Sequence, residues 1–131
     1  MAKSLIFSAC FSASAIEVEY DYTYMLQSPC AESSAISQAE CTSKKLGASD
    51  KKLNLVYRQL LKKLPEESRD AASKSDLISA QRAWLKYRDL DCHFRSATTG
   101  ANSTWQAAHG MSCAIKFNEY RIKTLKGLDP L

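Results

Sequence analysis

The sequence predicts an all-α protein: a small antiparallel bundle of three helices, or four, held together by two disulfides. Three observations predict it. Apolar residues recur at helical spacing along the chain, residues typical of helix ends separate the periodic segments, and four cysteines fall within or beside these segments. The chain has 131 residues, which is the size of one domain with one core.

The first fifteen residues resemble an export signal. Lys3 supplies a positive start, residues 5–11 are apolar, and residues 13–15 read Ala-Ser-Ala, an A-x-A cleavage pattern. Because the apolar stretch is short, a short buried or disordered N-terminus is the alternative interpretation. Cleavage would remove Cys10 and leave an even set of four cysteines in an oxidising compartment. We therefore predict a signal peptide at residues 1–15.

The composition limits the class of partner. No segment reaches the ~20 apolar residues needed to span a bilayer, so we expect no transmembrane segment. The net charge is only +4, and Lys3, which leaves with the leader, contributes to it. The cations Lys44, Lys51, Arg58 and Lys62 follow helical spacing on one side of one segment, which is typical of a solvated helix face. No basic run is interleaved with aromatics, so we expect no nucleic-acid binding.

Residues 16–33 form a predicted N-terminal arm that precedes a helical domain at residues 34–128. Aromatic and aliphatic residues alternate with polar ones over Ile16–Tyr24, which is the pattern of a strand. As a new N-terminus after cleavage, the same segment could equally be an extended arm. The arm also carries three acidic residues, Glu17, Glu19 and Asp21.

The first predicted helix runs from about Ser34 to Leu64. Its apolar seam advances by steps of three and four and consists of Leu46, Leu53, Tyr57, Leu60 and Leu64. The second helix, which runs to about Arg95, has two candidate starts. Pro65 suits a first helical position, whereas Ser73 and Asp76 form a capping pair. With the start at Pro65 the connection is very short, so the first two helices would form an antiparallel hairpin.

A third predicted helix follows the loop at residues 98–102. Asn102 or Ser103 can cap it, and it ends where Gly127 and Pro130 stop it. We expect this helix to return along the other two and complete a small bundle.

Polar residues interrupt both apolar seams. Asp50 lies on the first seam, and Gln81 and Arg88 lie on the second in step with Trp84. Asp50 and Gln81 lie at similar distances from Pro65, so we expect them to hydrogen-bond across the hairpin. The Arg88 side chain leans toward the helix N-terminus and so toward the same layer. We interpret these residues as fixing helix register, since buried polar groups need partners. A ligand cleft is the alternative, and catalysis would need a second carboxylate or a His nearby.

The positions of the four cysteines favour local bridges. Cys92 and Cys113 face each other across the 98–102 loop, Cys30 precedes the first helix, and Cys41 lies about two turns inside it. We therefore favour Cys30–Cys41 with Cys92–Cys113, each adding roughly 3 kcal/mol on the loop-entropy model. The pairing Cys41–Cys92 with Cys30–Cys113 remains open, because Cys41 and Cys92 are at comparable distances from Pro65.

Two histidines raise a metal alternative. His109 and Cys113 lie four residues apart on one helix face, and Cys92 and His93 lie across the loop, so a cytosolic chain with this set could bind zinc. A nucleophilic pair of Cys113 and His109 is a further alternative. In an exported protein we expect disulfides instead, and an oxidised cysteine cannot attack. We therefore predict no catalytic residue, no metal and no cofactor.

Two blocks of sequence, Asp50–Tyr57 and Gln81–Cys92, resemble the signature blocks of the LprI-type lysozyme-inhibitor domain family. The second block follows the pattern Gln-x-x-Trp-x-x-x-Arg-x-x-x-Cys, which is fairly specific, and the resemblance covers about residues 30–126. We interpret the matching residues as architecture rather than as an inhibitory site. They are Cys41, Asp50, Asn54, Tyr57, Gln81, Trp84, Arg88, Cys92, Cys113 and Arg121.

The resemblance implies a small, disulfide-bonded helical protein that is periplasmic or secreted. The activity for which the family is named is lysozyme inhibition. From the resemblance we therefore expect a non-enzymatic binding module that occludes the cleft of lysozyme or another cell-wall hydrolase. The alternative is a structural or accessory envelope protein, such as a secretion-system adaptor or an immunity partner. Lysozymes are typically basic, and so is this chain, so long-range steering between them is weakly repulsive. Glu17, Glu19 and Asp21 on the arm are the candidate acidic docking patch.

Overall fold

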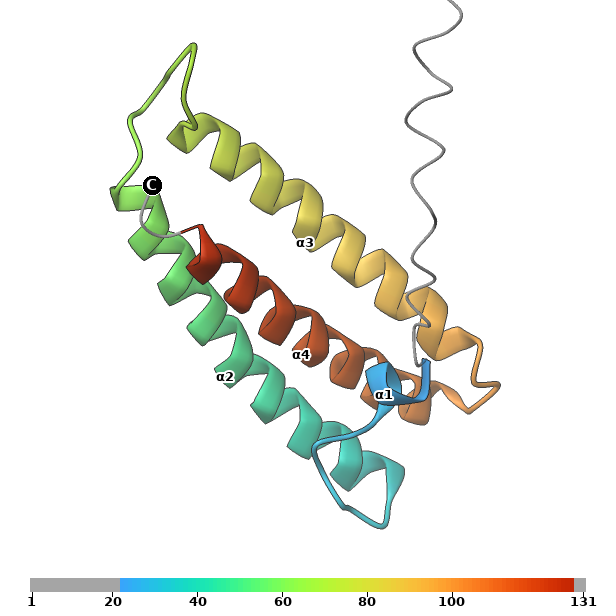
Figure 1. Ribbon diagram of the computed structural model, residues 1–131. Helices are drawn as coiled ribbons and strands as arrows, with labels where there is room; N and C mark the ends of the chain where they lie inside the picture. Colours follow the sequence, from blue (N-terminus) through green and yellow to red (C-terminus); the bar gives the residue numbers. More distant parts are fainter. Residues whose placement is uncertain (1–21, 129–131) are drawn as a thin grey trace, which may run out of the picture.

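The computed structural model describes residues 22–128, and within this range every regular element is a helix. Figure 1 shows α1 (Tyr22–Leu26), α2 (Ala35–Lys62), α3 (Lys74–Ala97) and α4 (Ser103–Gly127). The predicted all-α class is confirmed, with a short fourth helix in addition to the three long ones. The predicted leader and the acidic patch of the arm lie outside the described residues.

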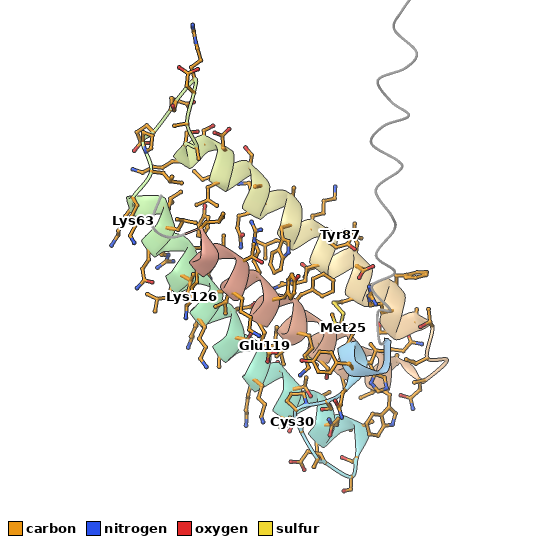
Figure 2. All side chains as sticks on the ribbon, viewed as in Figure 1. Met25, Cys30, Lys63, Tyr87, Glu119 and Lys126 are labelled. Atoms are coloured by element: carbon orange, nitrogen blue, oxygen red, sulfur yellow. A yellow bond between two sulfur atoms is a disulfide. The ribbon has the colours of Figure 1, made fainter. Side chains whose placement is uncertain are left out.

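The three long helices lie side by side with α4 between α2 and α3 (Figure 1). α2 and α4 run parallel to each other, as shown by Lys63 and Lys126 at the same end of the molecule (Figure 2), and α3 runs antiparallel to both. α2 packs mainly on α4, and α3 also packs on α4. The predicted α2–α3 hairpin is therefore wrong in its packing, because these two helices touch each other at few places.

The connection at residues 63–73 explains this difference. α3 begins at Lys74, not at Pro65, because Ser73 and Asp76 form a capping box in which each side chain accepts the other's backbone N–H, at 3.2 and 3.1 Å. The Pro65 carbonyl instead accepts a hydrogen bond from Lys74 N at 2.8 Å. Pro65 thus closes the linker onto the start of α3, and this longer linker allows α3 to lie against α4.

The other helix starts are where the sequence predicts them. Ser34 Oγ accepts from Ser37 N at 3.1 Å, and Asn102 Oδ1 accepts from Trp105 N at 3.1 Å, so each N-cap satisfies one orphan backbone donor. In the loop before Asn102, Gly100 has φ of 66°, a conformation that glycine adopts without steric cost.

The core consists of two apolar clusters separated along the helices by a polar layer. The first cluster contains Leu53, Leu60, Leu64, Leu77 and Leu125. The second surrounds the Cys92–Cys113 disulfide and includes Ala114. Since Asp50, Arg88 and Asn118 each fall between the two clusters in their own helix, polar groups from α2, α3 and α4 meet at mid-height.

The short helix α1 packs on the second cluster through Met25 and Leu26. The strand and extended-arm interpretations of Ile16–Tyr24 are both wrong where the structure describes this segment, since its last three residues belong to α1. In a helical turn consecutive side chains point about 100° apart, so both Met25 and Leu26 can reach the second cluster, whereas in a strand they would point to opposite faces. Lys116 Nζ lies 4.6 Å from the Tyr24 ring centroid and further connects α1 to α4.

The disulfides are Cys30–Cys41 and Cys92–Cys113, with Cα atoms 6.3 and 5.5 Å apart. The favoured local pairing is confirmed and the alternative pairing is excluded. None of the helices within residues 22–128 is long and apolar enough to cross a membrane.

Candidate functional site

The central polar cluster consists of Asp50, Arg88 and Asn118, one residue from each long helix. Arg88 Nη1 donates to Asp50 Oδ1 at 3.0 Å and to Asn118 Oδ1 at 2.8 Å. Asn118 Nδ2 donates in turn to Asp50 Oδ1 at 2.8 Å and to Ser49 Oγ at 3.1 Å. Each member contacts the other two, so the cluster fixes the positions of three helices relative to one another.

Burial within this cluster is uneven. The Arg88 side chain is 9% exposed, whereas its ion-pair partner Asp50 is 42% exposed. Arg88 also contacts Asp89, through Nε and Nη2 at 2.9 Å each. A buried guanidinium is costly unless it is paired, and here two carboxylates and an amide provide the pairing. The geometry supports the register-fixing interpretation of Asp50 and Arg88.

A second polar pair joins α3 and α4 on the side of the central cluster toward the start of α3 and the end of α4. Arg121 Nε donates to Gln81 Oε1 at 3.0 Å, and the guanidinium carbons of Arg121 and Arg88 lie 5.5 and 5.7 Å from the Trp84 ring centroid. Desolvation by burial lowers the pKa of the Arg121 guanidinium. The expected Asp50–Gln81 hydrogen bond is not formed, because Gln81 faces α4 instead of α2. The stacked cations give Trp84 a polar as well as an apolar role.

The two other polar residues of the first motif block differ in environment. Tyr57 is half-buried and packs on the leucine cluster, whereas Asn54 is exposed on α2. Neither takes part in the central polar cluster. Asn54 therefore makes no architectural contact there, unlike Asp50 four residues earlier.

Sequence reasoning missed Asn118, which is fully buried. Its signal was present, since Asn118 lies three residues after Ile115 and seven before Leu125, on the buried seam of α4. A lone amide on an apolar seam requires hydrogen-bond partners, and it finds them in Asp50 and Arg88.

Gln38 is a second buried amide that the sequence did not single out. Its Oε1 accepts from Glu32 N at 2.9 Å, and its Nε2 donates to the Cys30 carbonyl at 3.1 Å and to Ser28 Oγ. These bonds attach the segment before α2 to the first turns of that helix, beside the Cys30–Cys41 disulfide. The connection between α1 and α2 is thus fixed by both covalent and polar contacts.

The residues that the sequence offered for a metal site or a nucleophilic pair make other contacts in the structure. Cys92 and Cys113 form a disulfide, and the His109 ring stacks on Trp105 with centroids 6.2 Å apart. Among the described residues, no three side chains of His, Cys, Asp or Glu are grouped so that they could hold a metal ion.

A groove of about 500 Å³ opens between α3 and α4 beside the Cys92–Cys113 disulfide. Its lining is mainly apolar and includes Leu46, Met111 and Ala114, with polar atoms from His93 and Gln106. This groove is the structural counterpart of the ligand-cleft alternative, since Arg88 lies at its edge. Most of the Arg88 donors, however, bind Asp50, Asn118 and Asp89. These donors are therefore not available to a ligand in the groove.

The outer side of α3 presents large apolar side chains to solvent. Tyr87, Leu90 and Phe94 are 57%, 61% and 62% exposed, and Figure 2 labels Tyr87 on this helix. They lie at positions i, i+3 and i+7, which places them on one face of α3. We call these three residues the α3 ridge.

Comparison with known proteins gives one match. A family model described as lysozyme inhibitor LprI matches residues 30–125, which is most of the chain and includes α2, α3 and nearly all of α4. Searches of curated proteins and of solved structures found no match. The matched range contains both disulfides, the central polar cluster and the α3 ridge. The chain belongs to the lysozyme inhibitor LprI family.

Proposed function

We propose that the protein is an exported, non-enzymatic inhibitor of lysozyme-class peptidoglycan hydrolases that acts by occluding the substrate cleft in a stoichiometric complex. The observation that carries this proposal is the LprI family match over residues 30–125. The match includes both disulfides, α2, α3 and nearly all of α4 rather than a short motif. A protein partner is therefore the proposed ligand of this body.

The two disulfides support an extracytoplasmic location. Structural disulfides form and persist in oxidising compartments, where peptidoglycan hydrolases also act. In this proposal residues 1–15 are the signal peptide, residues 16–33 the arm, and residues 34–128 the inhibitory domain, released into the periplasm or secreted.

The arrangement of polar groups supports a binding role over catalysis. A catalytic carboxylate or base must be within reach of a substrate proton, whereas Asp50, Arg88 and Asn118 bind one another at the junction of three helices. The four described cysteines are oxidised and therefore not nucleophilic. These residues stabilise a rigid body, which favours binding because little freedom is lost in the complex.

Electrostatics limits how such an inhibitor can act. The chain has a net charge of +4, and typical lysozymes are also basic, so long-range attraction does not accelerate their encounter. We therefore expect an association rate of about 10⁵–10⁶ M⁻¹s⁻¹, with affinity supplied by slow dissociation from a well-fitted contact.

Lysis assays with several lysozyme types, together with a pull-down of each enzyme, test this proposal. We expect at least one type to lose activity in proportion to added protein and to be retained in the pull-down. Absence of binding to every type at micromolar concentration would refute lysozyme inhibition. Co-purification of an unrelated envelope protein instead would favour the accessory role of an adaptor or immunity partner.

A further inference from the structure

The α3 ridge is the one place in the described residues where three large, well-exposed apolar side chains adjoin on a single helix. The other exposed large apolar residues are separated from one another along the chain, among them Ile36, Leu55 and Tyr120. Single exposed apolar residues are ordinary, but a contiguous group is typical of an interaction site.

The spacing of the ridge fits a groove in a partner. Anchors at i, i+3 and i+7 are the pattern by which a helix inserts its apolar side into a hydrophobic groove. Tyrosine and phenylalanine are also enriched in protein–protein interfaces. Tyr87 to Phe94 spans about 10 Å along the helix axis, and all three side chains stay more than half exposed, although the Tyr87 ring also contacts Phe117 of α4.

One cation, Lys86, borders the ridge, and a second, Arg82, lies one turn farther toward the start of α3. Arg82 and Lys86 are exposed on α3, one turn apart, and Lys86 lies four residues before Leu90. Neither forms an ion pair with another described residue. Of the nearby acids, Asp89 is bound to Arg88 and Asp91 to Arg95. The side of the ridge beside Lys86 is therefore positive, and on the other side Asp91 is neutralised by its ion pair with Arg95.

A lysozyme cleft has the complementary chemistry. Retaining glycosidases cleave between two carboxyl groups about 5 Å apart, and in lysozyme the acid residue sits against an apolar, aromatic wall. Neighbouring side chains one helical turn apart, such as Arg82 and Lys86, have Cβ atoms about 5–6 Å apart. An apolar ridge with a cationic edge can thus pack on the wall and pair with the carboxylates, even though both proteins are basic overall.

We propose that the α3 ridge, with Lys86 at its edge and Arg82 one turn farther along α3, is the surface that enters the lysozyme cleft. This inference rests on the proposed function and adds the contact surface to it. Lys86 and Arg82 supply the charge complementarity, and Tyr87, Leu90 and Phe94 supply the apolar contact area.

Inhibition measurements on ridge variants with matched controls test the inference. Leu90→Gln and Phe94→Gln are the test variants, because Tyr87 also contacts the Phe117 ring at 5.9 Å and its removal would disturb packing. Leu55→Gln and Tyr120→Gln are the controls, since these side chains are similarly exposed, at 59% and 77%, on α2 and α4. Circular dichroism and the melting temperature verify that all four variants fold.

We expect each ridge substitution to raise the inhibition constant about tenfold or more, and each control to change it less than about threefold. Equal effects in ridge and control variants would overturn the inference while leaving lysozyme inhibition intact. Failure of the unmodified protein to inhibit any lysozyme would instead overturn the proposed function.

Charge reversal isolates the cationic edge. Lys86→Glu and Lys51→Glu change the net charge equally, but only Lys86 borders the ridge, whereas Lys51 is exposed on α2. We expect Lys86→Glu to weaken inhibition at least about tenfold more than Lys51→Glu. Equal weakening would show that overall charge matters and the edge does not.

Two further results would contradict the proposal: a second copy of the chain covering the ridge, or docking of lysozyme on the N-terminal arm. A dimer of the unmodified protein in analytical ultracentrifugation that Leu90→Gln converts to a monomer would show that a second copy covers the ridge. Loss of inhibition on neutralising Glu17, Glu19 and Asp21, with ridge variants unaffected, would assign docking to the arm instead.

Discussion

Asn118 illustrates how a single side chain determines the arrangement of three helices. It is the residue through which α4 contacts both the Asp50 carboxylate of α2 and the Arg88 guanidinium of α3. Without it, a buried cation would keep only its carboxylate partners, and α4 would lose its hydrogen bonds to Asp50 and Arg88 while keeping the Arg121–Gln81 bond to α3. The sequence contained the residue on an apolar seam, but only the structure shows which partners it binds.

Asn118→Ala should lower the free energy of unfolding by about 2–3 kcal/mol, because it removes hydrogen bonds of a buried amide to the buried Arg88 guanidinium and to the Asp50 carboxylate. Urea denaturation measures this loss. Asn54→Ala is the control: Asn54 is exposed, so its loss should stay within about 0.5 kcal/mol. Equal losses for the two variants would contradict the structural role of Asn118. The folded Asn118→Ala protein should still inhibit, since the cluster is not the docking surface.

At the scale of single elements, the start of α3 shows where local sequence signals succeed and where they compete. The Ser73–Asp76 pair and Pro65 were both legitimate start signals, and the two-way capping box formed at the first. Ser34 caps α2 as predicted, and of the adjacent candidates Asn102 and Ser103 the first caps α4. Local hydrogen bonding thus predicted these helix starts within one residue, whereas the candidates for α3 lay eight residues apart.

Ser73→Ala should destabilise the protein by about 1 kcal/mol, because α3 loses the acceptor for its Asp76 N–H and the Asp76 side chain loses a donor. Thermal unfolding followed by circular dichroism measures the change. Ser79→Ala, at an exposed position inside the same helix, should be neutral or slightly stabilising. A neutral Ser73→Ala would mean that the cap does not hold the start of α3.

The two disulfides should differ in how much each contributes to the free energy of unfolding. Replacing Cys92 and Cys113 with alanine should cost about 3 kcal/mol or more, because this bridge closes the longer loop, with a sequence separation of 21, and lies in the core. Replacing Cys30 and Cys41, separated by 11, should cost about 0.6 kcal/mol less from the loop term alone. Denaturant unfolding of both double variants compares them, and a larger loss at Cys30–Cys41 would contradict this order.

At the scale of the whole molecule, the sequence predicted the helices and disulfides of the bundle better than it predicted which helices pack together. Helical periodicity predicted three long helices, and cysteine positions favoured the correct bridges. α2 packs on α4 because the linker at residues 63–73 is long. The spacing of apolar residues within each helix does not predict the length of this linker. For the same reason Gln81 was assigned to Asp50 although it binds Arg121.

The candidate docking surface was also beyond sequence reasoning. Tyr87 and Phe94 are residue types that normally lie in a core, and Leu90 lies between them on the helix. Only the structure shows that all three side chains are more than half exposed, with Tyr87 also in ring contact with Phe117 of α4. The motif residues, in contrast, were recognisable in sequence because they build the architecture that positions this surface.

If this protein inhibits lysozyme by filling its substrate cleft, it must compete with an oligosaccharide for that cleft. The most direct measurement is the dissociation constant of the complex with and without a chitin oligosaccharide that occupies the cleft. At an oligosaccharide concentration one hundred times its own dissociation constant, competition should raise the apparent dissociation constant of the complex about a hundredfold. An unchanged dissociation constant, or no complex at micromolar protein, would contradict cleft occlusion.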